Sequence, residues 1–409
     1  MTEITIQRLG LQGDGVADGP VYVPLSLPGE IVEGTVVGTT LRDAKIVRPS
    51  DRRVTAPCRH FKSCGGCQLQ HADDAFVAEW KVDVVRTALH AHGLDADFRP
   101  IVTSPARSRR RAGFAARRTK KGAMVGFHGR ASDTIVPIPD CTLLDPALLK
   151  GIPAVEALAV IGASRKTALS VMITNTTNGL DVAITQGKPL DGPLRQHLAT
   201  VCHQFRLARL TWTGEVVAMR APPVHMIDGV PVTPPPGAFL QATAHGETAL
   251  INAVCDITQN ARRVLDLFSG CGTFSIPMSR HAAVHAIEGD HDMTDALDQA
   301  WRKAQGLKTI TSETRDLFRR PLLPDEMSKV QAIVLDPPRA GAEAQVAEIA
   351  KSRVPRIAYV SCSPASFARD AQKLVNAGFS LDWIQVVDQF RWSAHVELVA
   401  SFTAAHMPG

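Results

Sequence analysis

Two apolar, strand-like segments near the C-terminus end in residues whose side chains are suited to covalent chemistry. Cys362 ends the run RIAYVSC, and Asp336 ends the run AIVLD. Pro337 and Pro364 follow closely, and proline cannot continue a central strand, so both segments must turn at an exposed rim. A thiol in such a crevice can act as a nucleophile, and nearby cations favour its thiolate form. Cys362 is therefore a candidate nucleophile; the alternative is an inert buried cysteine.

A candidate base follows in the last apolar segment, VVDQFRWSAHVELVASF. Its alternation predicts a strand, in which Glu397 shares a face with His395 and Val399 because side chains repeat with a period of two. A carboxylate at this place can accept a proton. The alternative interpretation is a charge on an edge strand.

The segment VLDLFSGCGTF combines a strand, a glycine turn and a helix start. Gly270 and Gly272 allow a tight turn and a close approach of backbone to ligand, but the dinucleotide spacing G-x-G-x-x-G is absent. Asp266 leads the turn, and Glu288 ends the next strand, where a carboxylate can bind ribose hydroxyls. Asp316 follows a third strand-like segment and could reach an adenine amino group. The pattern predicts a nucleoside pocket without a phosphate cradle, which suits S-adenosylmethionine; each carboxylate alone could instead cap a helix.

A cysteine cluster lies further toward the N-terminus. The segment CRHFKSCGGC has the spacing C-x5-C-x2-C and supplies Cys58, Cys64 and Cys67. Zinc would need a fourth ligand such as His60 or His71, whereas an iron–sulfur cluster would need a fourth thiolate, for which Cys141 is the best candidate. The spacing is not the C-x3-C-x2-C of radical enzymes, so we infer no radical chemistry.

Three regions must position these residues. Residues 1–55 contain five short apolar alternations separated by glycine turns, which predicts a small β-barrel of the oligonucleotide-binding kind or a structural cap. Residues 56–235 are predicted as a central α+β domain, with a helix at about 73–93 that packs on the following domain. Residues 236–409 alternate strands and helices, which indicates a doubly wound α/β sheet with its ligand site at the carboxyl ends of the strands.

Composition limits the class of protein. The 409 residues are 45% hydrophobic and 21% charged, with a formal net charge of +5. No apolar run is long enough for a transmembrane helix and no secretory signal is present, so we expect a cytoplasmic protein without a membrane partner. Eight cations crowd one segment and could neutralise RNA phosphates or form the solvated face of a hairpin: Arg107, Arg109, Arg110, Arg111, Arg117, Arg118, Lys120 and Lys121.

Four motifs, in order, carry a family resemblance: LDLFSGCGTF, LDPPRAG, YVSCSP and DQFRWSAHVELV. Together they resemble the RNA uridine-C5 methyltransferases, and the first 55 residues resemble the TRAM domain of many members. The resemblance implies a class I methyltransferase fold for the C-terminal sheet. It also implies methylation of uracil carbon 5 in RNA, with Cys362 as nucleophile and Glu397 as proton acceptor.

The resemblance implies two cofactors. S-adenosylmethionine would be surrounded by Gln241, Phe268, Thr273, Glu288, Asp316 and Asp336. A [4Fe–4S] cluster would be held by Cys58, Cys64, Cys67 and Cys141. The TRAM-like part together with the cysteines favours 23S rRNA as the substrate over the thymidine loop of tRNA, and we expect a monomer.

The chain departs from the family pattern in three places. The nucleophile motif SCNP reads SCSP, with Ser363; the proline and threonine usual before His395 are replaced within Arg391–Ala394; and the FxQxN-like segment reads FLQAT, with Thr243 last. These changes bear on substrate contacts. They also motivate a rival interpretation, an RNA-binding or chaperone protein with a degenerate site, which the retained Cys362 and Glu397 oppose.

Overall fold

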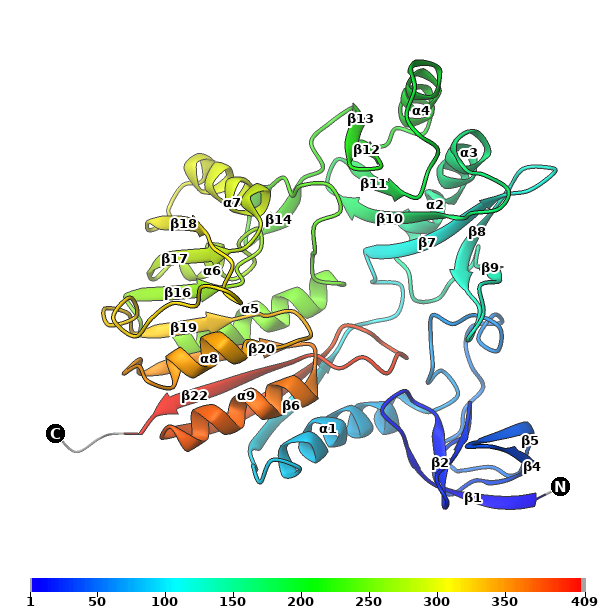
Figure 1. Ribbon diagram of the computed structural model, residues 1–409, viewed down its shortest axis with the longest axis horizontal. Coiled ribbons are helices and arrows are strands. Elements are labelled where there is room, and N and C mark those ends of the chain that lie inside the picture. Colours follow the sequence, from blue (N-terminus) through cyan, green and yellow to red (C-terminus); the bar gives the residue numbers. More distant parts are fainter. Residues whose placement is uncertain (1, 406–409) are drawn as a thin grey trace.

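The N-terminal strands close into a small barrel in the computed structural model, which describes residues 2–405 (Figure 1). Its core is apolar and contains Ile6, Val23 and Val32. The strand order is β1-β2-β3-β5-β4. The strands are β1 (Thr2–Leu9), β2 (Gly15–Ala17), β3 (Val21–Val23), β4 (Ile31–Val37) and β5 (Thr40–Arg48). The predicted five-stranded barrel is confirmed.

The central sheet has seven strands in the order β13-β12-β11-β10-β7-β8-β9, and all neighbours are antiparallel except β11 and β12. Helices α3 and α4 pack on it through Leu158 and Leu198. The elements are β7 (Arg111–Arg118), β8 (Ala123–His128), β9 (Ile135–Pro137), α2 (Pro146–Lys150), α3 (Ile152–Gly162), β10 (Leu169–Thr176), β11 (Gly179–Thr185), α4 (Gly192–Gln204), β12 (Arg209–Trp212) and β13 (Glu215–Met219). This is the predicted α+β architecture.

The C-terminal sheet has eight strands in the order β18-β17-β16-β19-β20-β22-β21-β6. The first five are mutually parallel, and β22 runs antiparallel to both its neighbours. The strands are β6 (Asp97–Thr103), β16 (Arg263–Leu267), β17 (Ala283–Glu288), β18 (Ile310–Thr314), β19 (Ala332–Leu335), β20 (Arg356–Ser361), β21 (Phe379–Asp388) and β22 (Leu398–Ala404). A two-stranded hairpin, β14 (His225–Ile227) and β15 (Val230–Val232), precedes it.

Alternation along the parallel strands divides the apolar side chains between the two faces of this sheet. Leu265 and Ile333 belong to one core, whereas Val264 and Ala332 belong to the other. Helices α1 (Asp74–His90), α8 (Glu343–Ile349) and α9 (Pro364–Asn376) cover the first face; α5 (Ala244–Thr258), α6 (Ser275–Met278) and α7 (His291–Lys303) cover the second (Figure 1). Among the described residues, no helix is both long and apolar enough to cross a membrane.

The order of the strands reverses between β16 and β19. Chain connections leave these two strands in opposite directions, so a crevice opens at their carboxyl ends, which is where ligands bind in open α/β sheets. Asp266 belongs to β16, and Asp336 directly follows β19. The doubly wound class I arrangement predicted from the sequence is therefore present.

One strand of the predicted central domain belongs to the C-terminal sheet rather than to the central one. Strand β6 falls inside the range 56–235 predicted for the central domain, yet it pairs in parallel with β21 at the edge of the C-terminal sheet. Helix α1 buries Val85 and Leu89 in the core of that sheet, as predicted for the helix at about 73–93. Helix and strand therefore belong with the C-terminal sheet, because their apolar faces are buried there.

A buried ion pair joins α1 to the end of β21. Lys81 Nζ lies 2.5 Å from Asp388 Oδ1, and the two side chains are 0% and 1% exposed. The same ammonium group donates a hydrogen bond to the carbonyl oxygen of Phe390 at 3.1 Å. Two charges removed from water in this way depend on each other, because either one alone would lack its solvation.

Replacing Lys81 with Met should destabilise the protein by about 3–5 kcal/mol, because it leaves the Asp388 carboxylate buried without a counter-charge. The control is Lys351→Met, which breaks an exposed pair with Glu348 and should cost at most about 1 kcal/mol. Thermal unfolding of both variants checks the prediction. Equal effects would show that the buried pair is not a stabilising contact.

Candidate active site

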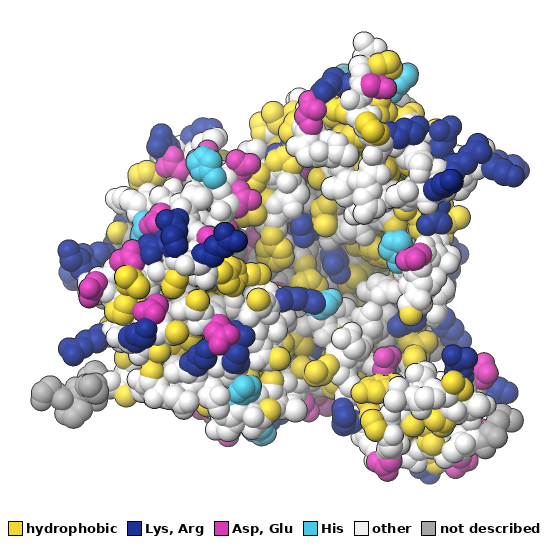
Figure 2. Space-filling view, viewed as in Figure 1, with side chains coloured by type: hydrophobic (Ala, Val, Ile, Leu, Met, Phe, Trp, Pro, Cys, Tyr) yellow, Lys and Arg dark blue, Asp and Glu magenta, His cyan; other side chains and the backbone are white. Residues whose placement is uncertain are grey.

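A cavity of about 580 Å³ lies at the carboxyl ends of the C-terminal strands, between that sheet and the central one. Figure 2 shows the surface hollowed between the two larger lobes, with hydrophobic and basic side chains inside the hollow. The volume is that of a small-molecule site. The lining includes all eight residues predicted for catalysis and cofactor binding: Gln241, Phe268, Thr273, Glu288, Asp316, Asp336, Cys362 and Glu397.

The glycine turn after β16 forms one wall. Phe268, Gly270 and Gly272 have φ angles of 62°, 54° and 92°. A Cβ on Gly272 would lie 2.4 Å from Leu297, so both the backbone conformation and the packing require glycine there. The N–H of Gly270 donates to Glu288 Oε2 at 2.9 Å, which ties the turn to the end of β17. This wall presents a carboxylate beside exposed backbone, as a nucleoside requires.

Two aromatic rings stand beside this wall. Phe268 and Phe318 have centroids 5.5 Å apart, and Phe318 is 48% exposed. Asp316 lies two residues before Phe318 and accepts a hydrogen bond from its N–H at 3.0 Å. A flat apolar surface next to a carboxylate suits a purine with an exocyclic amino group. Phe318 was not among the predicted residues, although its place two residues after Asp316 in RDLF was a usable signal.

Asp336 and Glu397 line the cavity and Asp266 is buried on the adjoining strand β16, and burial keeps these three carboxyl groups from ionising readily. It raises the pKa of Asp266 to about 7 and that of Glu397 to about 7. Burial, and then the neighbouring Glu397, raise the pKa of Asp336 well above its usual range. A group that titrates near neutral pH can exchange a proton with a substrate, which makes Glu397 suitable as a base.

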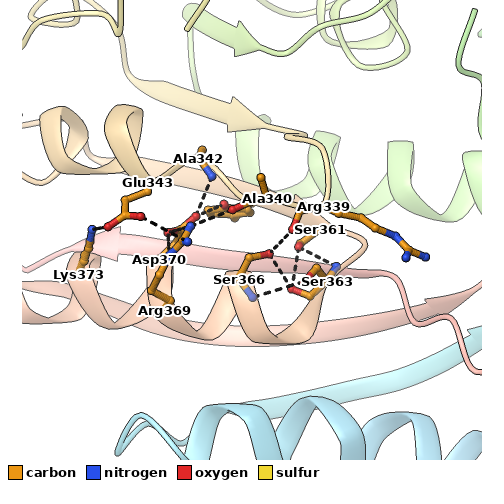
Figure 3. A network of polar contacts seen from close by, with 11 residues as sticks. Arg339, Ala340, Ala342, Glu343, Ser361, Ser363, Ser366, Arg369, Asp370 and Lys373 are labelled. Carbon is orange, nitrogen blue, oxygen red and sulfur yellow. Dashed lines mark hydrogen bonds and ion pairs between the residues drawn. The ribbon is translucent and has the colours of Figure 1, made fainter. Parts of the chain in front are cut away.

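The turn that carries Cys362 is held by a network of hydroxyl groups (Figure 3). The N–H of Ser363 donates to Ser361 Oγ at 3.2 Å, and Ser363 Oγ accepts from Ser366 N at 3.4 Å as the N-cap of α9. Ser366 Oγ donates to the carbonyl of Arg339 at 3.0 Å, which joins this turn to the one after Asp336. Serine and asparagine are equally good N-caps, so the change from SCNP to SCSP leaves the local structure intact.

The thiol of Cys362 has both acidic and basic side chains near it. Burial, followed by the carboxylates of Glu397 and Asp336, raises its pKa, whereas Arg339 opposes this effect. The positive end of the helix dipole of α9 lies close by in sequence, because the helix begins at Pro364. A cationic ligand beside the carboxyl groups would therefore favour the reactive thiolate.

A buried glutamine organises the base. Gln389 Oε1 accepts from the N–H of Ala242 at 2.7 Å, which fixes the orientation of its amide. Its Nε2 then donates to Gln241 Oε1 at 2.5 Å and to a carboxylate oxygen of Glu397. Gln241 in turn lies 3.5 Å from Asp336. The sequence offered no signal for this role of Gln389.

The prediction that His395 and Glu397 lie in a strand was wrong. Strand β21 ends at Asp388 and β22 begins at Leu398, so both residues belong to the connecting loop. Arg339 donates to His395 Nδ1 at 2.7 Å. Burial, and then Arg339, lower the pKa of His395, which keeps the ring nitrogen free to accept. The alternating pattern predicted a strand here, but the side chains of His395 and Glu397 face a cavity rather than a neighbouring strand.

The basic cluster is split between two environments. Arg109 lines the cavity with its guanidinium 5.6 Å from the ring of Phe390, and Arg110 pairs with the buried Glu247 at 2.7 Å. Lys120 and Lys121 are exposed at the β7–β8 turn. The first part of the segment therefore builds the site, and its tip faces solvent.

The four cysteines lie outside this cavity. Cys64, Cys67 and Cys141 are each 8% exposed and share one core, and Cys58 packs against it. Each of the four thiols lies within electrostatic range of the other three. Across residues 2–405, however, no three His, Cys, Asp or Glu side chains approach closely enough to hold a single metal ion. In the described part of the chain this holds both for a zinc site with His60 or His71 and for the four cysteines predicted to bind a [4Fe–4S] cluster.

Comparisons with known proteins show which family the chain is similar to. The family model described as tRNA (uracil-5-)-methyltransferase matches residues 233–403. An RNA methyltransferase of Rhizobium meliloti (strain 1021) is 42% identical over 407 residues, which cover 97% of this chain and 98% of the relative. The 23S rRNA (uracil(1939)-C(5))-methyltransferase RlmD of Shewanella sp. (strain ANA-3) is 31% identical over 432 residues and covers 98% and 95% of the two chains.

The fold has a full-length counterpart among solved structures. The tRNA (uracil-54, C5)-methyltransferase of Pyrococcus abyssi, in complex with S-adenosyl-L-homocysteine, superposes with a TM-score of 0.77 at 23% identity, over 98% of this chain and 99% of that one. Fold and site thus define an S-adenosylmethionine-dependent methyltransferase. The chain belongs to the RNA (uracil-C5-)-methyltransferase family, as its motifs predicted.

Glu397 should give the stability of the unliganded protein a measurable pH dependence. Its pKa is about 7 in the folded chain against an ordinary value of 4.5, so the unfolded chain loses the proton first as pH rises. The stabilisation present below pH 4.5 is lost as pH passes through 7, by about 1.4 kcal/mol for each pH unit and about 3 kcal/mol in all.

The uncharged variant Glu397→Gln lacks this loss and should become more stable relative to the natural protein between pH 5 and 8. Thermal unfolding midpoints across that range measure the difference. Glu79→Gln, a change at an exposed carboxylate, is the control and should follow the natural protein. Parallel curves for Glu397→Gln and the natural protein would contradict the assigned pKa.

Proposed function

We propose that this protein methylates carbon 5 of a uridine in 23S rRNA through a covalent adduct with Cys362. The observation that carries the proposal is the meeting of a thiol, a buried carboxyl group with a pKa of about 7 and a nucleoside-shaped wall in one cavity. A target base in folded RNA must be splayed out of its stack to enter such a cavity.

The residues of one wall fit S-adenosylmethionine. Glu288 is placed for the ribose hydroxyls, Asp316 for the adenine amino group, and the rings of Phe268 and Phe318 for the purine faces. Gln241 and Thr273 complete this half of the cavity. When bound, S-adenosylmethionine supplies an electrophilic methyl group on a positively charged sulfur.

The chain itself performs the remaining chemistry. The Cys362 thiolate adds to carbon 6 of uracil, and the electron pair of the carbon 5–carbon 6 bond becomes available at carbon 5 for the new bond to the methyl group. Burial raises the pKa of Asp336 well above its usual range, so its protonated form can donate to a uracil oxygen. Glu397 then removes the proton from carbon 5, the double bond reforms, and the thiolate leaves.

Separate replacements of Cys362 and Glu397 distinguish formation of the covalent adduct from its release. Cys362→Ala should lower methyl transfer by about 10⁴-fold or more while leaving RNA binding intact, because no adduct can form. Glu397→Gln should instead accumulate a covalent protein–RNA adduct, visible on a denaturing gel, because the thiolate cannot leave. Cys255→Ala, at a partly buried thiol on α5, is the control. Methylation by Cys362→Ala would refute the mechanism, and inactivity of the natural protein with intact RNA binding would favour the chaperone interpretation.

The choice of 23S rRNA rests on the relative of Shewanella, whose name specifies uracil 1939 of that RNA. A strain lacking this gene should lose 5-methyluridine at the corresponding position of 23S rRNA and regain it with the natural gene, but not with Cys362→Ala. Mass-spectrometric mapping of ribosomal and transfer RNA checks the result. Loss confined to the thymidine loop of tRNA would replace our substrate with the tRNA alternative.

We also propose a [4Fe–4S] cluster on Cys58, Cys64, Cys67 and Cys141. Its support is the family resemblance of the cysteine spacing, together with the placement of all four cysteines in or against one core, within electrostatic range of one another; a [4Fe–4S] cluster takes four thiolates. Arg130 braces the ligand loop by donating to the carbonyl oxygens of Phe61 and Cys67.

Anaerobically purified protein should contain about four iron ions per chain and absorb visible light. Cys64→Ser should lose both, whereas Cys202→Ser, at a buried cysteine on α4 in the central domain, should keep both. Zinc without iron in the natural protein would contradict the proposal.

The barrel is proposed to contact the RNA beyond the target base, as a TRAM-like domain. Strand β5 is exposed over most of its length and carries Arg42, Lys45 and Arg48. Cations along one exposed strand can neutralise successive phosphates without reading sequence. This surface, together with the tip of the β7–β8 hairpin, is suited to bind a folded RNA around the cavity.

A further inference from the structure

The loop that carries Glu397 lies against the cysteine-rich segment. We define the base loop as residues 389–397 and the cysteine-rich segment as residues 58–74. The N–H groups of Gln68 and Leu69 both donate to the carbonyl oxygen of Trp392, at 2.8 and 2.9 Å. Ala394 N donates to Gln68 Oε1 at 3.4 Å. The two segments, far apart in sequence, are therefore joined through their backbones directly after Cys67.

The side chain of Trp392 strengthens this junction. It is 6% exposed and belongs to the same core as Cys64, Cys67 and Cys141. Its indole N–H donates to Asp74 Oδ1 at 3.2 Å, and the neighbouring Arg391 pairs with the other oxygen of Asp74 at 2.5 Å. Trp392 of the base loop is thus inserted into the core that contains Cys64, Cys67 and Cys141, which we call the cysteine core.

The backbone of Trp392 is strained. Its φ angle is 60°, a conformation that costs a bulky residue about 1–3 kcal/mol and persists only where surrounding contacts impose it. The contacts that impose it here come from the cysteine-rich segment, because that segment binds the carbonyl oxygen and the indole of this residue. Without them the base loop would relax to another conformation.

The other end of the base loop holds the catalytic groups. His395 N donates to Ser393 Oγ at 3.1 Å, and Glu397 accepts from the buried Gln389. Only a few residues separate Trp392 from Glu397, so a change of backbone conformation at Trp392 moves the carboxylate relative to Cys362. Arg391 and Trp392 are also residues at which the chain departs from the family pattern, and the reaction itself gives them no role.

We propose that Trp392 is a positioning residue that ties the base loop to the cysteine-rich segment, so that an intact cysteine core keeps Glu397 in place for proton removal. The inference rests on the proposed role of Glu397. It gives the cysteine core a function in catalysis without contact between its thiols and the substrate.

The test compares two tryptophans of one core. Trp392→Leu removes the indole whose N–H binds Asp74. Trp212→Leu removes a buried indole of the same core on β12, whose N–H donates to the carbonyl oxygen of Lys188. Full-length proteins react with RNA and S-adenosylmethionine, and the ratio of covalent adduct to released product is measured on denaturing gels. This ratio does not depend on how much of each variant is folded.

Trp392→Leu should slow turnover by about tenfold or more and raise the adduct-to-product ratio by a similar factor, with faster hydrogen exchange in residues 389–397. Trp212→Leu should leave the ratio unchanged, even if it lowers the unfolding temperature. An unchanged ratio and unchanged exchange for Trp392→Leu would overturn the inference. If Glu397→Gln itself formed no adduct, the proposed mechanism rather than this inference would have failed.

Discussion

The site depends on carboxyl groups that are buried together at one end of a parallel sheet. Burial removes the water that would stabilise the ions of Asp266, Asp336 and Glu397, and the charges of Glu397 and Asp266 further raise the pKa of Asp336. Burial, and then the charges of Glu397 and Asp336, raise the pKa of the Cys362 thiol. A sulfonium ligand carries the compensating positive charge, so its entry favours both the ionised base and the reactive thiolate. Binding and activation are in this way parts of one electrostatic change.

The base loop is where all parts of the chain meet. Lys81 of α1 holds Asp388 at its start, Gln389 connects it to Gln241, and Trp392 inserts into the core that contains the cysteines. Helix α1 and strand β6 come from the first quarter of the sequence but complete the C-terminal sheet. Segments that precede the central sheet in sequence therefore complete the sheet that carries the site.

The motif changes have different consequences at different places. Ser363 replaces an asparagine with another good N-cap, and α9 begins normally. Arg391 and Trp392 replace residues of different shape and build contacts to Asp74 and the cysteine core. The first change preserves local structure, whereas the second creates an attachment particular to this pattern of residues. Neither change touches Cys362 or Glu397, the two residues that act in the proposed mechanism.

The sequence by itself determined the class of fold and the five-stranded barrel, and its family resemblance picked out eight of the residues that line the cavity. It could do so because parallel strands have apolar runs that end in functional residues, and because such ends converge at one edge of a sheet. Only the tertiary structure decided the loop position of His395 and Glu397, the roles of Phe318 and Gln389, and the division of the basic cluster. Periodicity records which side chains are buried, but not whether they are buried against a sheet, a cavity or a distant segment. Contacts such as that between Trp392 and Gln68 arise from chain reversals that no local pattern encodes.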